Sequence, residues 1–247
     1  MLTFADWERQ LERQFRWTKG IREHIYRQVG MVHFRDVLEV GCGTGLVTQE
    51  LAGKIRGRAV GLDRNPKMVE SARRRISAEN IKEGEATSLP FEDKSFDAVF
   101  CHYFFLWAQD RDKVMSELRR VTRPYGWVVA LAEPDYGGMI ENPDLGLREL
   151  HIQSIRREGG NPLVGRELLG VFTAAKLETQ VGVVARVWEE LEMKGEFEAE
   201  WDFLLKVLSE VRERSELEQL KKKEAHALKK DQRLVVLPMF YCLGRRK

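Results

Sequence analysis

Residues 37–45 constrain the fold of this chain more than any other stretch. Residues 37–40 are an apolar run interrupted only by Glu39, which is typical of a buried parallel strand. Three alternating glycines, Gly41, Gly43 and Gly45, follow at once, and residues 46–51 have helical spacing. Glycine suits such a turn because it reaches positive φ and lets a ligand approach the backbone closely. A strand, a glycine turn and a helix in this order predict the first unit of a nucleotide-binding α/β sheet.

The spacing of the glycines indicates which ligand the turn holds. The dinucleotide fingerprint G-x-G-x-x-G/A puts its third small residue where this chain has Leu46. The pattern E-x-G-x-G-x-G instead resembles motif I of the class I S-adenosylmethionine (SAM)-dependent methyltransferases. The resemblance implies that the turn lies under the methionine part of SAM and that Glu39 orients its amino end; a plain tight connection is the alternative. The turn residues are Gly41, Cys42, Gly43, Thr44 and Gly45.

Two further acids follow predicted strands. Asp63 ends the strand predicted at residues 58–63, about 20 residues beyond the glycine turn, where a ribose-binding acid belongs. Glu85 lies in a stretch that resembles the family's G-D-A-x-x-L-P-F loop, in which Asp is commoner, and the resemblance implies that it binds the adenine amino group. Parallel strands share their carboxyl edge, so we expect Glu39, Asp63 and Glu85 to converge there. The alternative role for Asp63 is a helix cap.

The resemblance extends the expected cofactor site to neighbouring residues. Met68 lies on a helix that Asn65 and Pro66 begin well, at the family's adenine-contacting position, with ordinary core packing as the alternative. The other neighbours expected to contact the cofactor are Arg64, Ala86, Thr87, Cys101 and His102.

His102 is the candidate catalytic residue. It ends the strand predicted at residues 95–102, where the family faces the methyl group and the substrate. An imidazole near its ordinary pKa can act as a general base, and a neutral packed histidine is the alternative. The chain lacks the N/D-P-P-Y/F motif of enzymes that methylate amino groups of nucleic-acid bases, and the Pro-Cys pair of cytosine C5 enzymes. After the fifth strand, Glu133 and Asp135 either line an acceptor pocket or hold their loop.

Residues 1–30 carry an apolar stripe at three- and four-residue steps and a basic opposite face, which predicts a helical N-terminal cap. Class I methyltransferases often place such a leading helix over the cofactor. On that basis Trp17 and Arg22 are expected to close over SAM, because an arginine fork suits its carboxylate. A solvated basic face is the alternative.

The remaining segments complete an α/β architecture. Residues 31–136 form the expected SAM-binding core, and residues 137–176 a helical lid, broken at residues 159–162. The polar residues of this lid either meet substrate or form a solvated helix face, which is the favoured alternative; they are Arg148, His151, Gln153, Arg156 and Arg157. Residues 177–247 are expected to complete the sheet around a helical insertion at about residues 190–231. The predicted fold is Rossmann-like: a seven-stranded, mostly parallel sheet with an antiparallel last strand, helices on both faces and helical lid insertions.

Composition restricts the class of protein. The net charge of +2, from 41 basic and 39 acidic residues, gives no global case for a nucleic-acid or membrane-surface partner. The abundance of Lys, Arg and Glu is typical of a thermophile. Three cysteines without C-x-x-C spacing argue against disulfides and a metal site and favour the cytoplasm. The N-terminus is charged from Asp6 onward, unlike a signal peptide, and no apolar run approaches the roughly 20 residues of a membrane span.

These features predict a SAM-dependent methyltransferase that acts by direct displacement on a small-molecule acceptor and releases S-adenosylhomocysteine. The loop after the third strand and the fourth strand most resemble the branch of ubiquinone and menaquinone methyltransferases. Three alternatives stay open. They are an RNA (tRNA or rRNA) methyltransferase that uses the basic N-terminal face and the lysines at residues 221–223, an NAD-binding oxidoreductase, and a SAM-binding module without catalysis.

Overall fold

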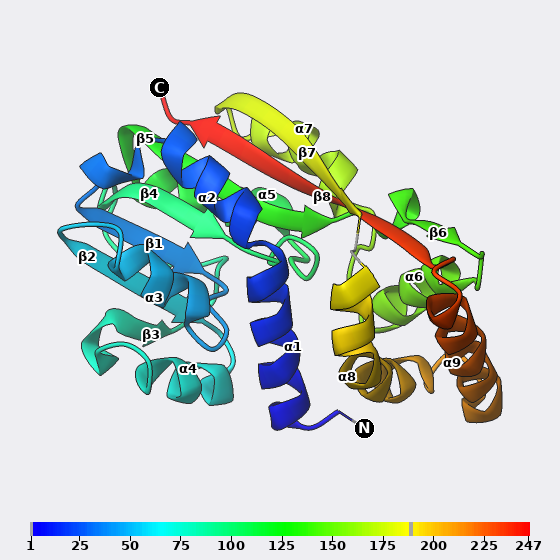
Figure 1. Cartoon of the computed structure of the whole chain (residues 1–247). Helices are drawn as coiled ribbons and strands as arrows, with labels where there is room; N and C mark the ends of the chain where they lie inside the picture. Colours follow the sequence, from blue (N-terminus) through cyan, green and yellow to red (C-terminus); the bar gives the residue numbers. More distant parts are fainter. Residues whose placement is uncertain (1, 188–189) are drawn as a thin grey trace.

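The computed structural model describes residues 2–187 and 190–247, which form a mixed sheet with helices on both faces (Figure 1). The strands are β1 (Asp36–Val40), β2 (Arg58–Asp63), β3 (Ile81–Glu83), β4 (Phe96–Cys101), β5 (Thr122–Pro134), β6 (Ile140–Asn142), β7 (Glu178–Val187) and β8 (Leu234–Arg245). The α-helices are α1 (Phe4–Trp17), α2 (Lys19–Gln28), α3 (Leu46–Ala52), α4 (Pro66–Arg73), α5 (Arg111–Val121), α6 (Leu147–Arg157), α7 (Val164–Ala174), α8 (Glu190–Leu208) and α9 (Arg214–Lys229). Short 3-10 turns are η1 (Met31–His33), η2 (Ala78–Asn80) and η3 (Tyr136–Gly138).

The sheet has the order expected of a Rossmann-like fold. Its parallel part runs β3-β2-β1-β4-β5, and β1 pairs with both β2 and β4. β8 then pairs antiparallel with β5 on one edge and with β7 on the other. Because the strand order reverses between β1 and β4, a crevice opens beyond their carboxyl ends. The predicted fold class is confirmed.

The described sheet has eight strands, one more than predicted, because residues 140–142 form the short strand β6. β6 pairs with the beginning of β8, where Val236 contacts Ile140 on one edge and Val187 on the other. The expected lid at residues 137–176 therefore starts with a turn and a strand, and its first α-helix begins only at Leu147. A strand of three residues is too short to show a hydrophobic period, so the sequence did not reveal it.

Helices cover both faces of the parallel strands. Leu51 of α3 packs in the core on one face, and Leu118 of α5 and Leu168 of α7 pack in the core on the other. Adjacent residues of β4 belong to opposite cores: Phe100 lies in the core that contains Leu51, and Val99 lies in the core on the other face. Side chains alternate along a strand, so a strand that is covered on both faces is apolar at every position. This explains the unbroken apolar runs in the sequence.

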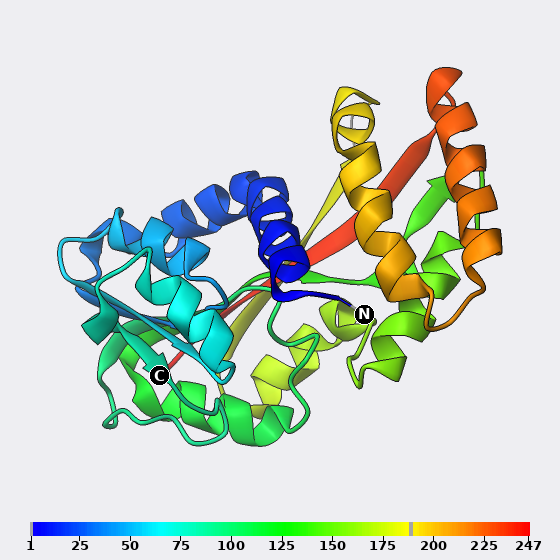
Figure 2. The same cartoon turned by 90° about the horizontal axis from the view of Figure 1, so that it is seen from below.

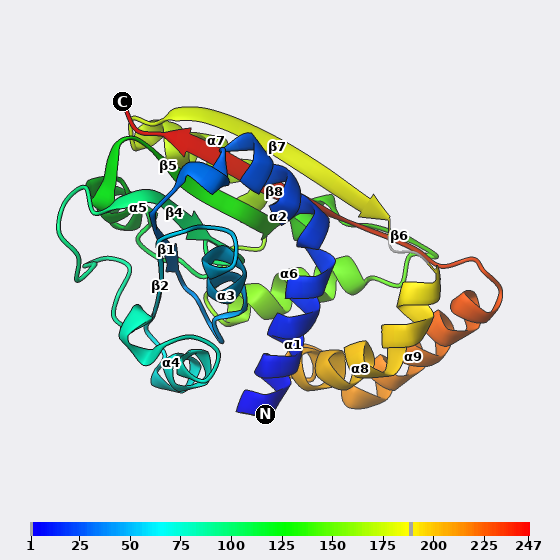
Figure 3. The same ribbon diagram turned by 60° about the vertical axis from the view of Figure 1, so that its left-hand side comes forward.

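Helices α6, α8 and α9 form a separate lobe beside β6 and the beginning of β8 (Figures 1 and 2). Its core contains the fully buried Trp201, with Leu204 and Leu208 of α8 and Leu217 of α9. Helix α1 lies between this lobe and the carboxyl edge of the parallel strands (Figure 3). Segments from the start, middle and end of the chain thus meet beside one edge of the sheet.

Local signals in the sequence set several helix ends. Thr3 begins α1 in a capping box with Asp6, and Asn65 caps α4 by accepting from the N–H of Lys67. The break predicted at residues 159–162 separates α6 from α7. No helix in the described part of the chain is long and apolar enough to cross a membrane.

Candidate active site

A cavity of about 750 Å³ lies at the carboxyl edge of the parallel strands. One part of its wall, here called the sheet-edge half, consists of the lining residues between positions 40 and 102, which follow β1, β2, β3 and β4. The other part, called the helical half, consists of the lining residues at positions 7–17 and 136–237, from α1, η3, α6, α8, α9 and β8. Residues between 103 and 114 line the cavity between the two halves.

The glycine turn after β1 brings the backbone to the cavity. Gly41, Gly43 and Gly45 have φ angles of +73°, +51° and +82°, a region that favours glycine. Gly41 and Gly43 line the cavity. A Cβ added to Gly41 would lie 2.6 Å from a ring carbon of Phe104, and one on Gly45 would lie 3.0 Å from the Cβ of Ala72. The backbone and the space around the turn therefore both require glycine.

Asp63, at the end of β2, fixes the glycine turn. Its Oδ2 accepts from the N–H of Gly43 at 2.8 Å, and its Oδ1 accepts from the N–H of Asn65 at 2.9 Å. Burial raises the pKa of Asp63 above its ordinary value, and these backbone donors oppose the rise. A carboxylate offers about four lone-pair sites, so Asp63 retains capacity for a ligand. Glu85 also lines the cavity, and its carboxylate has no hydrogen-bond partner among the described residues.

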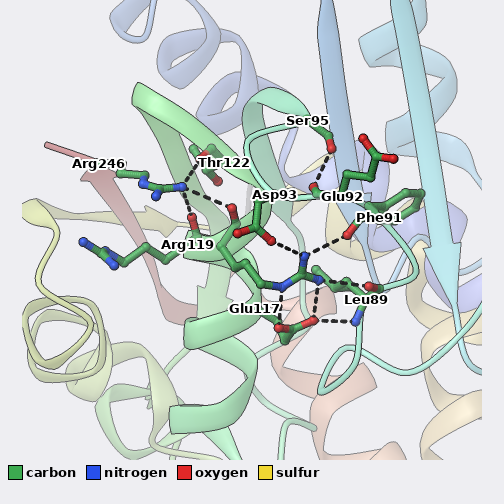
Figure 4. Close-up of polar contacts among 10 residues, drawn as sticks. Leu89, Phe91, Glu92, Asp93, Ser95, Glu117, Arg119, Thr122 and Arg246 are labelled. Atoms are coloured by element: carbon green, nitrogen blue, oxygen red, sulfur yellow. Dashed lines mark hydrogen bonds and ion pairs between the residues drawn. The ribbon is translucent and has the colours of Figure 1, made fainter.

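Two charged residues of α5 fix the loop that follows Glu85, and Figure 4 shows one of them, Glu117, beside Leu89 of this loop. Arg120 donates to the carbonyl oxygens of Leu89 at 3.0 Å and Phe91 at 2.8 Å. Its Nε also donates to Glu117 at 2.7 Å, and Glu117 in turn accepts from the N–H of Leu89 at 2.7 Å. Hydrogen bonding to Glu117 raises the pKa of Arg120. The L-P-F part of the loop is therefore held on α5 by a charged pair.

His102, at the end of β4, lies in the cavity wall and contacts the N-terminal helices. Its Nε2 is 2.8 Å from the Oγ1 of Thr18, which also accepts from Arg22 at 2.6 Å. Burial lowers the pKa of His102 to about 3, and the charge of Arg22 lowers it further. His102 is therefore neutral at physiological pH and a weak base. These contacts suit a residue that connects the sheet to the N-terminal helices better than they suit the expected catalytic base.

Glu133 of β5 holds the loop after β4. Its two carboxylate oxygens accept from the N–H groups of Phe104 at 2.8 Å and Leu106 at 3.2 Å. The carboxyl group is fully buried, and burial raises its pKa to about 7 against the effect of these hydrogen bonds. Asp135 is also buried; it pairs with Arg166 and accepts from the N–H of Gly138. Both acids hold loops, the second of the two roles considered for them.

Ion pairs join α1 to α8 along the helical half. Arg13 donates to Glu196 at 3.0 Å and also pairs with Glu200. The indole N–H of Trp17 donates to Glu196 at 3.2 Å, and Arg16 pairs with the same carboxylate at 3.0 Å. Arg13, Trp17 and both glutamates line the cavity. Residues about 180 positions apart in the chain are thus held together beside the cavity.

Tyr136 and His151 form a ring pair in the helical half. Tyr136 begins η3, His151 lies on α6, and their ring centroids are 5.0 Å apart with planes 32° from parallel. Burial raises the pKa of Tyr136 to about 12 and lowers the pKa of His151 to about 4. Both side chains are therefore uncharged at physiological pH.

Most of the residues predicted for the site do line this cavity. They are Trp17, Gly41, Gly43, Asp63, Arg64, Met68, Glu85, Ala86, Thr87 and His102. Six do not: Glu39, Cys42, Thr44, Gly45, Cys101 and Arg22.

Arg22 lies outside the cavity wall because its guanidinium has other partners. It is fully buried, forms a two-pronged pair with Glu50 at 3.2 and 2.8 Å, and donates to the carbonyl oxygen of Phe15. It cannot form the expected fork to a SAM carboxylate without losing these bonds. Glu39 likewise points into the protein, where it accepts from the hydroxyl of Thr48, and burial raises its pKa to about 8.

The other residues outside the wall are buried beneath the turn. Cys42 belongs to a small apolar cluster with Val69, Cys101 packs in the core between the sheet and α5, and Thr44 is buried. All three cysteines are free thiols. Among the described residues, no group of three or more His, Cys, Asp or Glu side chains could hold a metal ion.

Sequence reasoning missed most of the helical half. Among the aromatic residues of this half, Trp17 and His151 were named from the sequence, but no role was assigned to Tyr136, Phe197 or Trp201, which also line the cavity. The available signal was the cluster of aromatic residues after β4 together with aromatics in the two insertions. That signal does not distinguish a cavity wall from a core, because both are apolar.

Comparison with known proteins identifies the sheet-edge half. Residues 38–130 match the family model described as a methyltransferase domain. These residues form a class I methyltransferase domain. The matched range contains the glycine turn, Asp63, Glu85 and His102, so the domain supplies the sheet-edge half, and the segments outside it supply the helical half.

The relatives of the methyltransferase domain include enzymes named for small acceptors. A demethylmenaquinone methyltransferase of Lactobacillus johnsonii is 33% identical over 117 residues, 44% of this chain and 48% of that protein. A malonyl-[acyl-carrier protein] O-methyltransferase of Halorhodospira halophila is 36% identical over 102 residues, 40% of this chain and 35% of that protein. The chain spans about half the length of such relatives or less.

Solved structures share the fold over almost the whole chain. The YcgJ protein of Bacillus subtilis has a TM-score of 0.59 at 19% identity, covering 93% of this chain and 99% of its own. The [4+2]-cyclase SpnF has a TM-score of 0.58 at 17% identity, covering 94% of this chain and 80% of its own. At such identities the likeness concerns the fold alone.

Proposed function

We propose that this protein transfers the methyl group of SAM to a small, largely apolar acceptor. The observation that carries the proposal is the division of one cavity into two chemically different halves. The sheet-edge half offers exposed backbone at two glycines and carboxylates at two strand ends, whereas the helical half is mainly aromatic and aliphatic. A polar cofactor and an apolar acceptor would fit these halves side by side.

The residues present in the sheet-edge half fit SAM. Gly41 and Gly43 line the cavity without side chains, so their backbone is open to the methionine part. Asp63 has lone pairs left for ribose hydroxyls, and the carboxylate of Glu85 is open to an amino group such as that of adenine. Met68, Ala86 and Thr87 complete this side of the wall. We keep these residues, with Arg64, as the proposed cofactor-binding set.

Bound SAM would supply a methyl group already activated by a positively charged sulfur. The protein then has to orient the acceptor, exclude water and hold the reacting groups in line. Glu133 fixes the loop that carries Phe104 and Leu106 between the two halves, and α1 covers the cavity through its pairs with α8. Residues 31–136 are thus proposed to hold SAM, and the segments 1–30, 137–176 and 190–231 to enclose the acceptor.

A small acceptor fits the size of the cavity. A volume of about 750 Å³ falls in the range of roughly 300–1,000 Å³ that is usual for small-molecule sites. The demethylmenaquinone methyltransferases among the relatives support this acceptor class. The free, buried state of all three thiols supports a reducing compartment such as the cytoplasm.

Calorimetric titration with SAM, S-adenosylhomocysteine and NAD tests the cofactor assignment. We expect micromolar binding of the first two, about 10-fold weaker in Asp63→Ala and unchanged in Asp112→Ala, an acid outside the cavity wall. Binding of NAD alone would overturn the proposal.

A screen of acceptors, with S-adenosylhomocysteine measured as product, then tests the transfer itself. Turnover with a small apolar molecule supports the proposal. SAM binding without turnover on any acceptor indicates a binding module. Turnover on RNA, with affinity falling steeply as salt rises, indicates an RNA methyltransferase.

A further inference from the structure

We propose that the helical half binds an uncharged, ring-bearing molecule through a hydroxyl group, which hydrogen-bonds to Tyr136 and His151. This inference deepens the proposed function, on which it rests, by naming the chemical class of the acceptor and the two side chains that recognise it. Four features of the described residues carry it: the placement of the ring pair, its unused polar atoms, the state of the nearby charges and the apolar walls.

The backbone of Tyr136 and the helix that carries His151 are anchored outside the cavity. The N–H of Tyr136 donates to the carbonyl oxygen of Pro162 at 2.9 Å, and the preceding Asp135 is buried and paired with Arg166. His151 lies in the middle of α6, whose Leu147 and Leu150 are buried in the core of the helical lobe. These contacts therefore fix the backbone from which the two rings reach the cavity.

The polar atoms of both rings are unused. Neither the hydroxyl of Tyr136 nor a ring nitrogen of His151 has a hydrogen-bond partner among the described residues, and both side chains line the cavity. A polar group removed from bulk water without a partner costs about 1–3 kcal/mol, so such groups in a cavity wall are suited to a ligand. A neutral imidazole offers one acceptor nitrogen, and a phenol offers one donor. A ligand hydroxyl, which both donates and accepts, matches this pair.

The arginines of the helical half are already paired with carboxylates. Arg13 pairs with Glu196 and Glu200, and Arg233 pairs with Glu224 at 2.6 Å and with Glu141 at 3.2 Å. The described lining of the helical half therefore offers an anionic ligand no free cation, because its arginines already have carboxylate partners. Glu158 also lines this half and has no ion pair among the described residues, and burial, with the charge of Glu210, raises its pKa. Burying an unpaired charge is costly, so the paired part of the lining favours an uncharged ligand.

The surrounding walls are aromatic and aliphatic. Trp107 lies in the loop after β4, Phe197 and Leu204 come from α8, and Ile155 and Val235 come from α6 and β8. Flat apolar faces of this kind pack against rings and exclude water from the hydroxyl. Ring and hydroxyl together define the class: a phenol or a related hydroxylated ring.

Equilibrium binding of four probes with one ring system, without SAM, tests the inference. The probes are 2-naphthol, naphthalene, 2-naphthoate and 2-naphthylmethylammonium, each titrated calorimetrically. We expect 2-naphthol to bind about 10-fold more tightly than naphthalene, because it adds two hydrogen bonds, and both charged probes to bind more weakly than naphthalene.

The variants Tyr136→Phe and His151→Phe assign the effect to the two side chains. Each is expected to weaken 2-naphthol binding about 5-fold and to leave naphthalene binding unchanged, which also shows that the pocket still folds. The matched controls are Tyr241→Phe and His24→Phe, a second tyrosine–histidine ring pair outside the cavity, with centroids 6.1 Å apart; they should change neither affinity.

Equal binding of 2-naphthol by wild type and both variants would overturn the inference, as would preferred binding of either charged probe. These outcomes are independent of the cofactor titration. If S-adenosylhomocysteine binds and 2-naphthol is not distinguished from naphthalene, the proposed function stands and the hydroxyl-binding site does not.

Discussion

The two halves of the cavity are built in different ways. The sheet-edge half comes from one stretch of the chain between positions 40 and 102, and much of it is backbone at the ends of parallel strands. The helical half comes from α1, near the start of the chain, and from α6, α8 and α9, which begin more than a hundred residues later, and it consists of side chains. The first depends on turn geometry and the second on packing between distant helices.

This difference separates binding of the cofactor from recognition of the acceptor. A backbone turn fixed by Asp63 and glycine geometry presents the same groups whatever the surrounding helices do. A wall of side chains that come mainly from helices outside the parallel strands can change its chemistry without disturbing the sheet. The match of the family model to residues 38–130, and not to the insertions, agrees with this division.

The two largest effects that separate the halves are expected in the pH dependence of stability. The pKa of His151 is lowered to about 4 from an ordinary value of 6.5, so between these values the unfolded chain binds a proton that the folded chain does not. Its contribution to the free energy of unfolding is present above pH 6.5 and decreases on acidification, by up to about 3 kcal/mol at pH 4. Urea unfolding of His151→Phe should show a flatter acid limb than wild type; an unchanged slope would contradict this.

Glu39 is expected to show the opposite sign in the sheet-edge region. Its pKa is raised to about 8 from 4.5, so the folded chain holds the extra proton and its contribution to stability is lost as pH rises through that range. Glu39→Gln should remove this loss, so that the alkaline limb of the stability curve becomes flatter while the acid limb due to His151 remains.

Gly41→Ala should damage the sheet-edge half alone. The φ of +73° strains any residue with a Cβ, and the added carbon would lie 2.6 Å from the ring of Phe104. We expect S-adenosylhomocysteine to bind about 30-fold more weakly, from a cost of about 2 kcal/mol. Gly170→Ala, in α7 with no atom within 4 Å of the new Cβ, is the control and should not reduce binding. Equal effects of the two substitutions would rule out a special role for the turn.

Arg120→Ala tests whether the ion pair between Arg120 and Glu117, outside the cavity wall, supports the sheet-edge half. Removing the guanidinium releases the carbonyl oxygens of Leu89 and Phe91 and leaves Glu117 without its cation. Affinity for S-adenosylhomocysteine should fall about 5-fold, from the loss of about 1 kcal/mol in loop order, while binding of naphthalene stays constant. Arg119→Ala, on the same helix, serves as the control because no side-chain bond joins Arg119 to the loop.

Glu196→Gln is expected to give the smallest effect, confined to the helical half. The amide keeps the shape of the side chain but loses the charge that pairs with Arg13 and Arg16. Since Arg13 is buried and Glu196 is partly exposed, unfolding should become easier by about 1 kcal/mol, with cofactor affinity unchanged. Glu23→Gln, which breaks the exposed 4.0 Å pair with Lys19, should have almost no effect on stability.

Much of the fold and of the sheet-edge half could be predicted because the sequence patterns that indicate them are local. Strands covered on both faces read as continuous apolar runs, and Gly41, Gly43 and Asp63 occupy positions fixed by the turn and by the end of β2. The caps of α1 and α4 likewise depend on hydrogen bonds between residues that are close in the sequence. Short-range geometry of this kind depends little on the rest of the molecule.

The rest was decided only by the tertiary structure, because it depends on which distant groups become neighbours. Arg22 was expected at the cofactor, yet the fold buries it against Glu50. His102 was expected to act as a base, yet burial beside Arg22 lowers its pKa to about 3. Tyr136 and His151 meet only because α6 packs against the turn after β5. The sequence by itself determined the sheet and the turn at its carboxyl edge, and long-range packing decided the charge, the partners and the exposure of the groups that line the helical half.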